Sequence, residues 1–133
     1  MTADTSVVVP ALAGWHENHE AAASALDDVA ALPAHVLIEA YAVLTRLPGG
    51  LAVAPEGAAA VLASRFGQEP LQLAGAARRT LLTTLAAAGI GGGASYDGLV
   101  ALEAAAHEHV LLTRDARAQD IYRRLGVAFR TLA

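Results

Sequence analysis

The sequence of 133 residues lacks cysteine and lysine completely and holds few aromatic residues: one Trp, three Tyr and two Phe. Without cysteine, the chain cannot form disulfides, thiolate metal sites or a cysteine nucleophile. Its composition is typical of a reducing compartment, so we expect a cytoplasmic protein. All nine basic residues are arginine, which excludes a Walker-type phosphate loop and Schiff-base chemistry, because both need lysine. Two-component receivers and haloacid dehalogenases commonly use a lysine beside their aspartates and are disfavoured for the same reason.

Long apolar runs and an excess of positive charge are also missing. No uninterrupted apolar segment approaches the roughly 18 residues of a membrane span. The N-terminal MTADTS has no basic segment followed by an apolar one, so we expect neither a membrane anchor nor a secretory signal. The net charge of −4 argues against a nonspecific coat on nucleic acid.

The remaining pattern alternates short apolar segments with longer helical ones, without a linker or an internal repeat. The predicted strands are residues 1–4, 35–37, 71–73, 110–113 and 127–131. The predicted helices are residues 6–15, 16–32, 38–47, 56–66, 76–88, 96–107 and 116–125, the last closed by Gly126. Strands that alternate with helices favour a parallel sheet with helices on both faces. We therefore predict one domain over residues 1–133, an α/β fold that forms a three-layer α/β/α sandwich around a central parallel sheet.

Four acidic residues each interrupt or end an otherwise apolar segment. They are Asp4 in TADTSVVVPAL, Glu39 in HVLIEAYAVL, Asp97 in GASYDGLVAL and Asp115 in HVLLTRD. An ionised carboxylate beside a core is costly to desolvate. Asp4 and Asp115 follow predicted strands, while Glu39 and Asp97 lie in the first turns of predicted helices. Open α/β sheets bind ligands beyond the carboxyl ends of their strands, so we expect all four acids near one edge of the sheet.

Four carboxylates in one cleft would repel each other strongly without a cation. Hard oxygen ligands suit Mg²⁺ or Mn²⁺ rather than Zn²⁺, and a water bound to such an ion can attack a phosphodiester. The alternative is that each acid is simply a helix cap, which is the favoured interpretation for any one of them. It is weaker for all four together, because Glu39 and Asp97 have apolar neighbours on both sides.

The order of these motifs resembles the PIN-domain family. Asp-Thr-Ser near the N-terminus is followed by Glu in an apolar helix, then by Gly-Gly-Ala-Ser-Tyr-Asp, and finally by Leu-Leu-Thr-Arg-Asp. Within the family the pattern is most similar to the VapC-type toxins of bacterial toxin–antitoxin pairs, and the resemblance covers the whole chain. It implies a parallel sheet between layers of helices and endoribonuclease activity that depends on Mg²⁺ or Mn²⁺.

The resemblance also implies roles for individual residues and for partners. It makes the four acids both the catalytic residues and the metal ligands, namely Asp4, Glu39, Asp97 and Asp115. It implies that Thr113 supports the site and that Thr5 and Ser6 orient Asp4. The implied partners are an RNA substrate, a VapB-type antitoxin whose tail blocks the cleft, and a second copy of the chain in a homodimer.

Three arginines are candidates for contacts to the RNA backbone. Arg46 lies seven residues after Glu39, which returns it to roughly the same helix face, although a solvated helix end is an open alternative. Arg114 and Arg117 border Asp115, and phosphate contacts supply most of the nonspecific affinity for nucleic acid.

The leading hypothesis from the sequence is therefore a metal-dependent endoribonuclease toxin that hydrolyses RNA with a metal-activated water. Two alternatives stay open. One is a PIN-like module that binds RNA or a protein without turnover, and the other is a DNA nuclease of the same fold.

Overall fold

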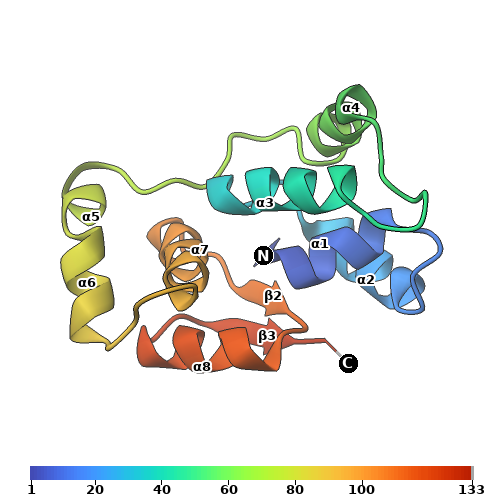
Figure 1. The fold of residues 1–133 in the computed structure, drawn as a ribbon. Helices are drawn as coiled ribbons and strands as arrows, with labels where there is room; N and C mark the ends of the chain where they lie inside the picture. The colour runs from blue at the N-terminus through green and yellow to red at the C-terminus, as the bar shows by residue number, and fades with distance from the viewer. Residues whose placement is uncertain (133) are drawn as a thin grey trace.

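Three short parallel strands form the centre of the computed structural model, which describes residues 1–132 (Figure 1). Strand β1 covers Thr2–Ala3, β2 covers Leu111–Thr113 and β3 covers Phe129–Thr131. They pair in the order β1-β2-β3, and both pairs are parallel. Helices α1 to α4 gather on one side of the strands and α8 lies on the other (Figure 1). The predicted α/β fold with a central parallel sheet is thereby confirmed; residue 133 of the predicted domain lies outside the described residues.

Eight α-helices and one 3-10 helix surround the strands within residues 1–132. They are α1 (Thr5–Leu12), α2 (His19–Ala25), η1 (Leu26–Asp28), α3 (Ala34–Thr45), α4 (Pro55–Arg65), α5 (Gly75–Arg79), α6 (Leu81–Ala87), α7 (Ala94–Ala106) and α8 (Ala116–Arg124). Helix α8 closes as predicted, because Gly126 at φ 68° adopts the left-handed conformation that a helix end requires and that glycine tolerates best.

The parallel register brings the carboxyl ends of β1 and β2 next to each other. Ala3 pairs with Leu112, and the Asp4 N–H extends this ladder by donating to the Leu112 carbonyl at 3.0 Å. Asp4 therefore leaves the sheet beside Thr113, which is followed two residues later by Asp115. Two acids from opposite ends of the chain start their loops at the same edge.

The predicted strands at residues 35–37 and 71–73 are wrong. Residues 35–37 lie within α3, and residues 71–73 contribute only a single bridge, between Leu71 and Pro33. The Leu71 N–H donates to the Leu32 carbonyl, and the Leu71 carbonyl accepts from the Ala34 N–H, both at 2.9 Å. Helix α3 begins at Ala34, and the Val36 N–H that would extend this ladder donates instead to the Pro33 carbonyl at 2.9 Å, so pairing stops after one bridge.

Two of the predicted helices are shorter than expected because helical propensity competes with burial. The segment 16–32 becomes α2 and η1, followed by extended Val29. Leu26, Val29 and Leu32 are each at most 2% exposed. In a continuous α-helix a repeated spacing of three residues would shift the side chains by about 60° around the helix at each step. The predicted helix at residues 76–88 is divided at Thr80 into α5 and α6.

The core lies where α1, η1, α3 and α8 meet the strands. Its largest fully buried side chains include Leu26, Leu32, Leu111 and Tyr122. No helix within residues 1–132 is both long and apolar enough to cross a membrane.

Candidate metal centre

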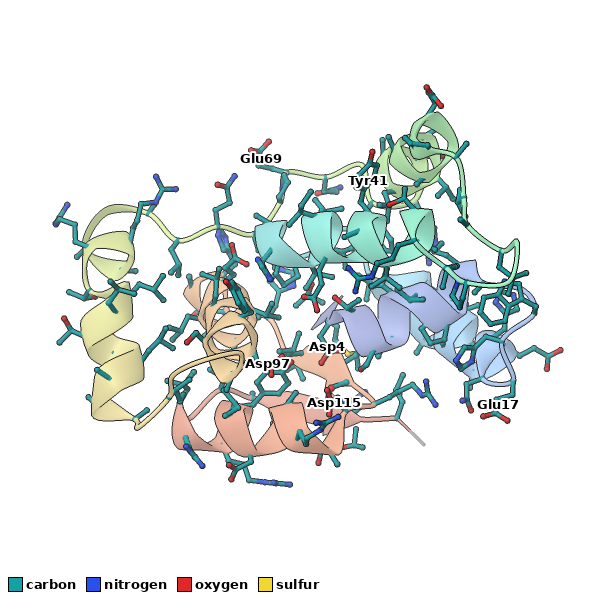
Figure 2. All side chains as sticks on the ribbon, viewed as in Figure 1. Asp4, Glu17, Tyr41, Glu69, Asp97 and Asp115 are labelled. Carbon is teal, nitrogen blue, oxygen red and sulfur yellow. The ribbon has the colours of Figure 1, made fainter. Side chains whose placement is uncertain are left out.

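The four acids reach one small cavity from four different elements. Asp4 follows β1, Glu39 lies in α3, Asp97 lies in the first turn of α7 and Asp115 follows β2. All four line a cavity of about 40 Å³, together with Thr5, Ser6 and Val100. Figure 2 shows Asp4, Asp97 and Asp115 gathered at the centre of the molecule. The structure thus brings the four together, although Glu39 lies in the second turn of its helix, because α3 starts at residue 34 rather than 38.

Asp4 is held by hydrogen bonds through both carboxylate oxygens. Its Oδ1 accepts from the Ser6 N–H at 3.0 Å and from the Ser6 hydroxyl at 2.5 Å, and its Oδ2 accepts from the Tyr122 hydroxyl at 2.7 Å. Burial raises the pKa of Asp4, and these hydrogen bonds oppose the rise. Burial first, and then the charge of Asp4, raise the pKa of the Tyr122 hydroxyl above its usual range, so that it remains a donor.

Two hydroxyl groups tie the ends of β1 and β2 together. The Ser6 Oγ accepts a hydrogen bond from the Arg114 N–H at 2.8 Å and lies 3.4 Å from the Thr113 Oγ1. The Thr113 Oγ1 in turn accepts from the Asp115 N–H at 3.1 Å. Thr113 is fully buried, so this network fixes the position of the two acid-bearing loops relative to each other.

Asp4 and Asp115 are also helix N-caps. Asp4 caps α1, which therefore begins at Thr5 rather than at residue 6 as predicted. Asp115 caps α8 through Oδ1, which accepts from the N–H groups of Arg117 and Ala118 at 2.9 and 3.4 Å. Helix N-termini stabilise ionised carboxylates. Capping is therefore compatible with a second role for these acids.

The pKa of Asp97 reflects the charges of the other three acids. The pKa of Asp97 is raised to about 6, first by burial and then by the charges of Asp115, Glu39 and Asp4, while Arg117 lowers it. The other three acids are therefore close enough to disfavour its ionised form. A cation in the cavity would remove this repulsion.

The oxygen donors around the cavity fit a hydrated divalent cation. No three acidic or histidine side chains within the described part of the chain are grouped closely enough to hold an ion by themselves. Mg²⁺, however, typically takes one or two carboxylates directly and fills its other positions with water. The 40 Å³ cavity can hold water, since one molecule needs about 10–15 Å³. The buried Thr5 hydroxyl, which has no hydrogen-bond partner within residues 1–132, offers a further oxygen.

A second cavity of about 540 Å³ adjoins the 40 Å³ cavity, and Asp97 and Asp115 line both. It is completed by residues at the start of α7 and along α8, namely Gly93, Ala94, Arg117, Asp120 and Ile121. Of the three candidate arginines, Arg117 lines this space. The Arg114 guanidinium instead points its Nη1 toward a backbone carbonyl of α1 at 3.5 Å. Arg46 is exposed at the C-cap of α3, away from the lining of both cavities.

Two residues of this region were missed by the sequence analysis. Tyr122 lies seven residues after Asp115, two turns along α8, but a buried tyrosine gives no distinct signal in a sequence. Glu103 lies in VALEAAA, an acid among apolar residues, which is the same signal that identified Glu39. Glu103 is 5% exposed and accepts a hydrogen bond from the His35 N–H at 3.1 Å. It thereby joins α7 to α3, the two helices that carry Asp97 and Glu39.

Comparison with known proteins agrees with this geometry. The family model described as PIN domain matches residues 1–124. The chain is 47% identical over 128 residues to Ribonuclease VapC27 of Mycobacterium tuberculosis, which covers 96% of this chain and 93% of that protein. It is 46% identical over 124 residues to Ribonuclease VapC40 of Mycobacterium tuberculosis, which covers 93% of this chain and 92% of the relative. The chain therefore belongs to the PIN-domain family, and these relatives within it are VapC ribonucleases.

Proposed function

We propose that this protein is a metal-dependent endoribonuclease and the toxin of a toxin–antitoxin pair. The observation that carries the proposal is the convergence of four acids from four elements on one cavity. Its relatives of 46% and 47% identity bear the name ribonuclease, which supports RNA as the substrate class. Mg²⁺ or Mn²⁺ is the proposed ion, because every donor in the cavity is an oxygen.

The proposed metal ligands are the carboxylates of Asp4, Asp97, Asp115 and Glu39, acting directly or through water. When bound, the ion supplies an activated water and neutralises charge on the phosphate. Thr5, Ser6 and Thr113 support the site from around Asp4.

The protein's own groups then hold the reactants in place. Ser6 and Tyr122 fix both oxygens of Asp4, so that this carboxylate does not reorganise during the reaction. Arg117 faces the larger cavity beside Asp97 and is proposed to bind an RNA phosphate, with weaker roles for Arg46 and Arg114. Water adds to phosphorus and the bond to the 3′ oxygen breaks, which leaves a 3′-hydroxyl and a 5′-phosphate.

The proposed partners are a VapB-type antitoxin and a second copy of the chain, in the cytoplasm. Exposed apolar side chains on α3 and α4 support contacts with another protein: Ile38 is 59% and Val61 39% exposed. Basic antitoxin residues entering the acidic cavity would be electrostatically complementary. Sedimentation of the purified chain, alone and with its antitoxin, measures both assemblies.

The test of the nuclease function is cleavage of RNA by the purified protein in Mg²⁺, Mn²⁺ or EDTA. We expect products with either metal and none in EDTA. Asp4→Asn and Asp97→Asn keep the size of the side chain and remove one charge each, and both should abolish cleavage. Asp27→Asn is the matched control, because Asp27 is exposed on η1 and lies outside both cavities at the acids; it should cleave like the wild type.

Two other outcomes correspond to the alternatives. RNA binding that is equal in EDTA and gives no products would indicate a binding module without turnover. Preferential cleavage of single-stranded DNA over RNA would indicate a DNA nuclease. Equal cleavage by the wild type, Asp4→Asn and Asp97→Asn would show that the acids are not the active site.

A further inference from the structure

Tyr96 is an exposed aromatic side chain beside the acidic cavity. Tyr122 and Phe66 are 0% and 4% exposed, whereas Tyr96 is 59% exposed. It immediately precedes Asp97, which lines both cavities. Single exposed apolar residues are common on proteins, so its exposure alone indicates little. Its surroundings make it unusual.

The Tyr96 ring is stacked on the imidazole of His35. The ring centroids are 5.2 Å apart and the ring planes differ by 11°. Tyr96 lies in the first turn of α7 and His35 in the first turn of α3, so the pair spans the two helices that carry Asp97 and Glu39. The imidazole covers one side of the phenol ring, while more than half of the tyrosine surface remains open to solvent.

His35 is held in place by three separate contacts. Its backbone N–H donates to the buried Glu103 carboxylate at 3.1 Å. Its Nε2 lies 3.6 Å from the Glu39 Oε2, and Tyr96 packs against its ring face. Only 21% of the His35 side chain is exposed. The stack is therefore ordered before any ligand arrives, which lowers the entropic cost of placing a third ring on it.

A planar ring at this position can bind RNA beside the acids without using positive charge. The net charge of the chain is −4, and the acids surround the place where a phosphodiester must bind, so only the proposed ion and, among the described residues, Arg117 attract the RNA backbone there. Stacking on an aromatic face needs no positive charge and is available to every base. Sequence-specific RNA recognition commonly uses unpaired bases stacked on Tyr or His rings.

We propose that the Tyr96–His35 pair is a stacking subsite for one nucleobase of single-stranded RNA, next to the phosphodiester that is cleaved. The inference rests on the proposed nuclease function and adds to it the group that positions the substrate. Tyr96 supplies the ring face, and His35 supports it from α3.

Kinetics on a short single-stranded RNA test the subsite. Tyr96→Ala should lower kcat/KM about tenfold, mainly through a higher KM, because one stacked base is lost. Tyr96→Phe keeps the ring and should stay within about twofold of the wild type. Trp15→Ala is the matched control: Trp15 is also exposed, at 54%, but lies in the connection between α1 and α2, outside the acidic cavity, and the variant should cleave like the wild type.

A substrate lacking one base separates stacking from a purely structural effect. An abasic residue is placed in turn at each nucleotide beside the cleaved bond. At one position the abasic residue should lower the kcat/KM of the wild type about tenfold and change that of Tyr96→Ala little, since the two changes remove the same contact. The subsite would be overturned if the effects of the abasic residue and of Tyr96→Ala multiplied at every position, or if Tyr96→Ala were as active as the wild type. Either result would leave the nuclease function intact.

A binding measurement decides the question even if no RNA is cleaved. Single-stranded RNA carrying 2-aminopurine is titrated with protein in Ca²⁺. Quenching of the fluorescence by the wild type and Tyr96→Phe, but not by Tyr96→Ala, supports the stack. Quenching without cleavage in Mg²⁺ or Mn²⁺ refutes the nuclease function alone. Equal quenching by all three proteins refutes the subsite alone.

Discussion

Glu103 gives the sharpest quantitative test of the structure. Its carboxylate is 5% exposed, and its Oε1 accepts a hydrogen bond from the His35 N–H, near the start of α3. Pro33 occupies the N-cap of α3 and makes no side-chain cap. Glu103 therefore supplies from α7 an acceptor that the local sequence of α3 does not provide. Burial raises the pKa of Glu103 to about 7, and the hydrogen bond from His35 opposes the rise.

The sign of the pH dependence follows from the raised pKa. The ordinary value for the unfolded chain is 4.5, so the folded state binds the proton more tightly. The stability from this proton is fully present below about pH 4.5 and is lost as the pH rises through about 7. A gap of roughly 2.5 pKa units corresponds to about 3 kcal/mol, of which about 2 kcal/mol falls between pH 5 and pH 8.

The perturbation is Glu103→Gln, which keeps an acceptor for the His35 N–H but cannot ionise. Its buried amide N–H groups carry a cost that does not change with pH. The free energy of unfolding of the variant minus that of the wild type should therefore rise by about 2 kcal/mol from pH 5 to pH 8, whatever its value at pH 5. Titrations of other groups occur in both proteins and cancel in this difference.

The assay is urea unfolding followed by circular dichroism, in EDTA, at several pH values across this range. Glu69→Gln is the control, because Glu69 is exposed between α4 and α5 at the edge of the molecule (Figure 2), and its difference from the wild type should stay flat. A flat difference for Glu103→Gln as well would refute the burial of an ionisable carboxylate between α7 and α3.

Three further predictions concern the acids and their donors. The pKa of Asp97 is raised from 3.8 to about 6, so its charge lowers the stability of the folded state as the pH rises through 6. After discounting for its partial exposure, the free energy of unfolding of Asp97→Asn should be about 1 kcal/mol higher than that of the wild type at pH 8 in EDTA. A lower melting temperature for this variant under those conditions would contradict the repulsion. Tyr122→Phe removes a buried donor to Asp4 and should lower the free energy of unfolding at pH 7 by about 1–3 kcal/mol, as measured by urea unfolding. Unchanged stability would show that this hydrogen bond contributes little. Ser6→Ala should lower the free energy of unfolding by about 1–2 kcal/mol, because the Arg114 N–H and Asp4 both lose a hydrogen-bond partner. Calorimetric titration of this variant should show weaker Mn²⁺ binding, and wild-type affinity would exclude a supporting role for Ser6.

The acids in apolar segments could be predicted to lie together because desolvating a carboxylate costs free energy in any fold. A carboxylate near a core needs a partner, so Asp4, Glu39, Asp97 and Asp115 were recognisable before any contact was known. The same rule applied to Glu103 would have found a second type of partner, a backbone N–H of another helix. Of these five acids only Asp4 and Glu103 are buried, whereas 44% of the Glu39 side chain is exposed. The pattern therefore detects acids beside the core without distinguishing candidate metal ligands from acids that hold helices together.

Strand prediction failed where a helix begins directly beside a strand bridge. Residues 35–37 are apolar enough for a strand, but α3 begins at Ala34, immediately after the bridge between Pro33 and Leu71. Local composition does not decide this competition, because a short apolar segment fits either a strand or a buried helix, and here the N–H groups of residues 36 and 37 donate to the Pro33 carbonyl within the helix.

The sequence by itself determined the α/β class, the inventory of oxygen ligands and the absence of lysine and cysteine chemistry. Each of these depends on residue types and on their order along the chain. Only the tertiary structure decided which groups meet: Tyr122 with Asp4, Glu103 with His35, and His35 with Tyr96. These pairs come from segments far apart in the sequence or from different helices. Their contact depends on parallel strand register and helix packing, which no local pattern of residues encodes.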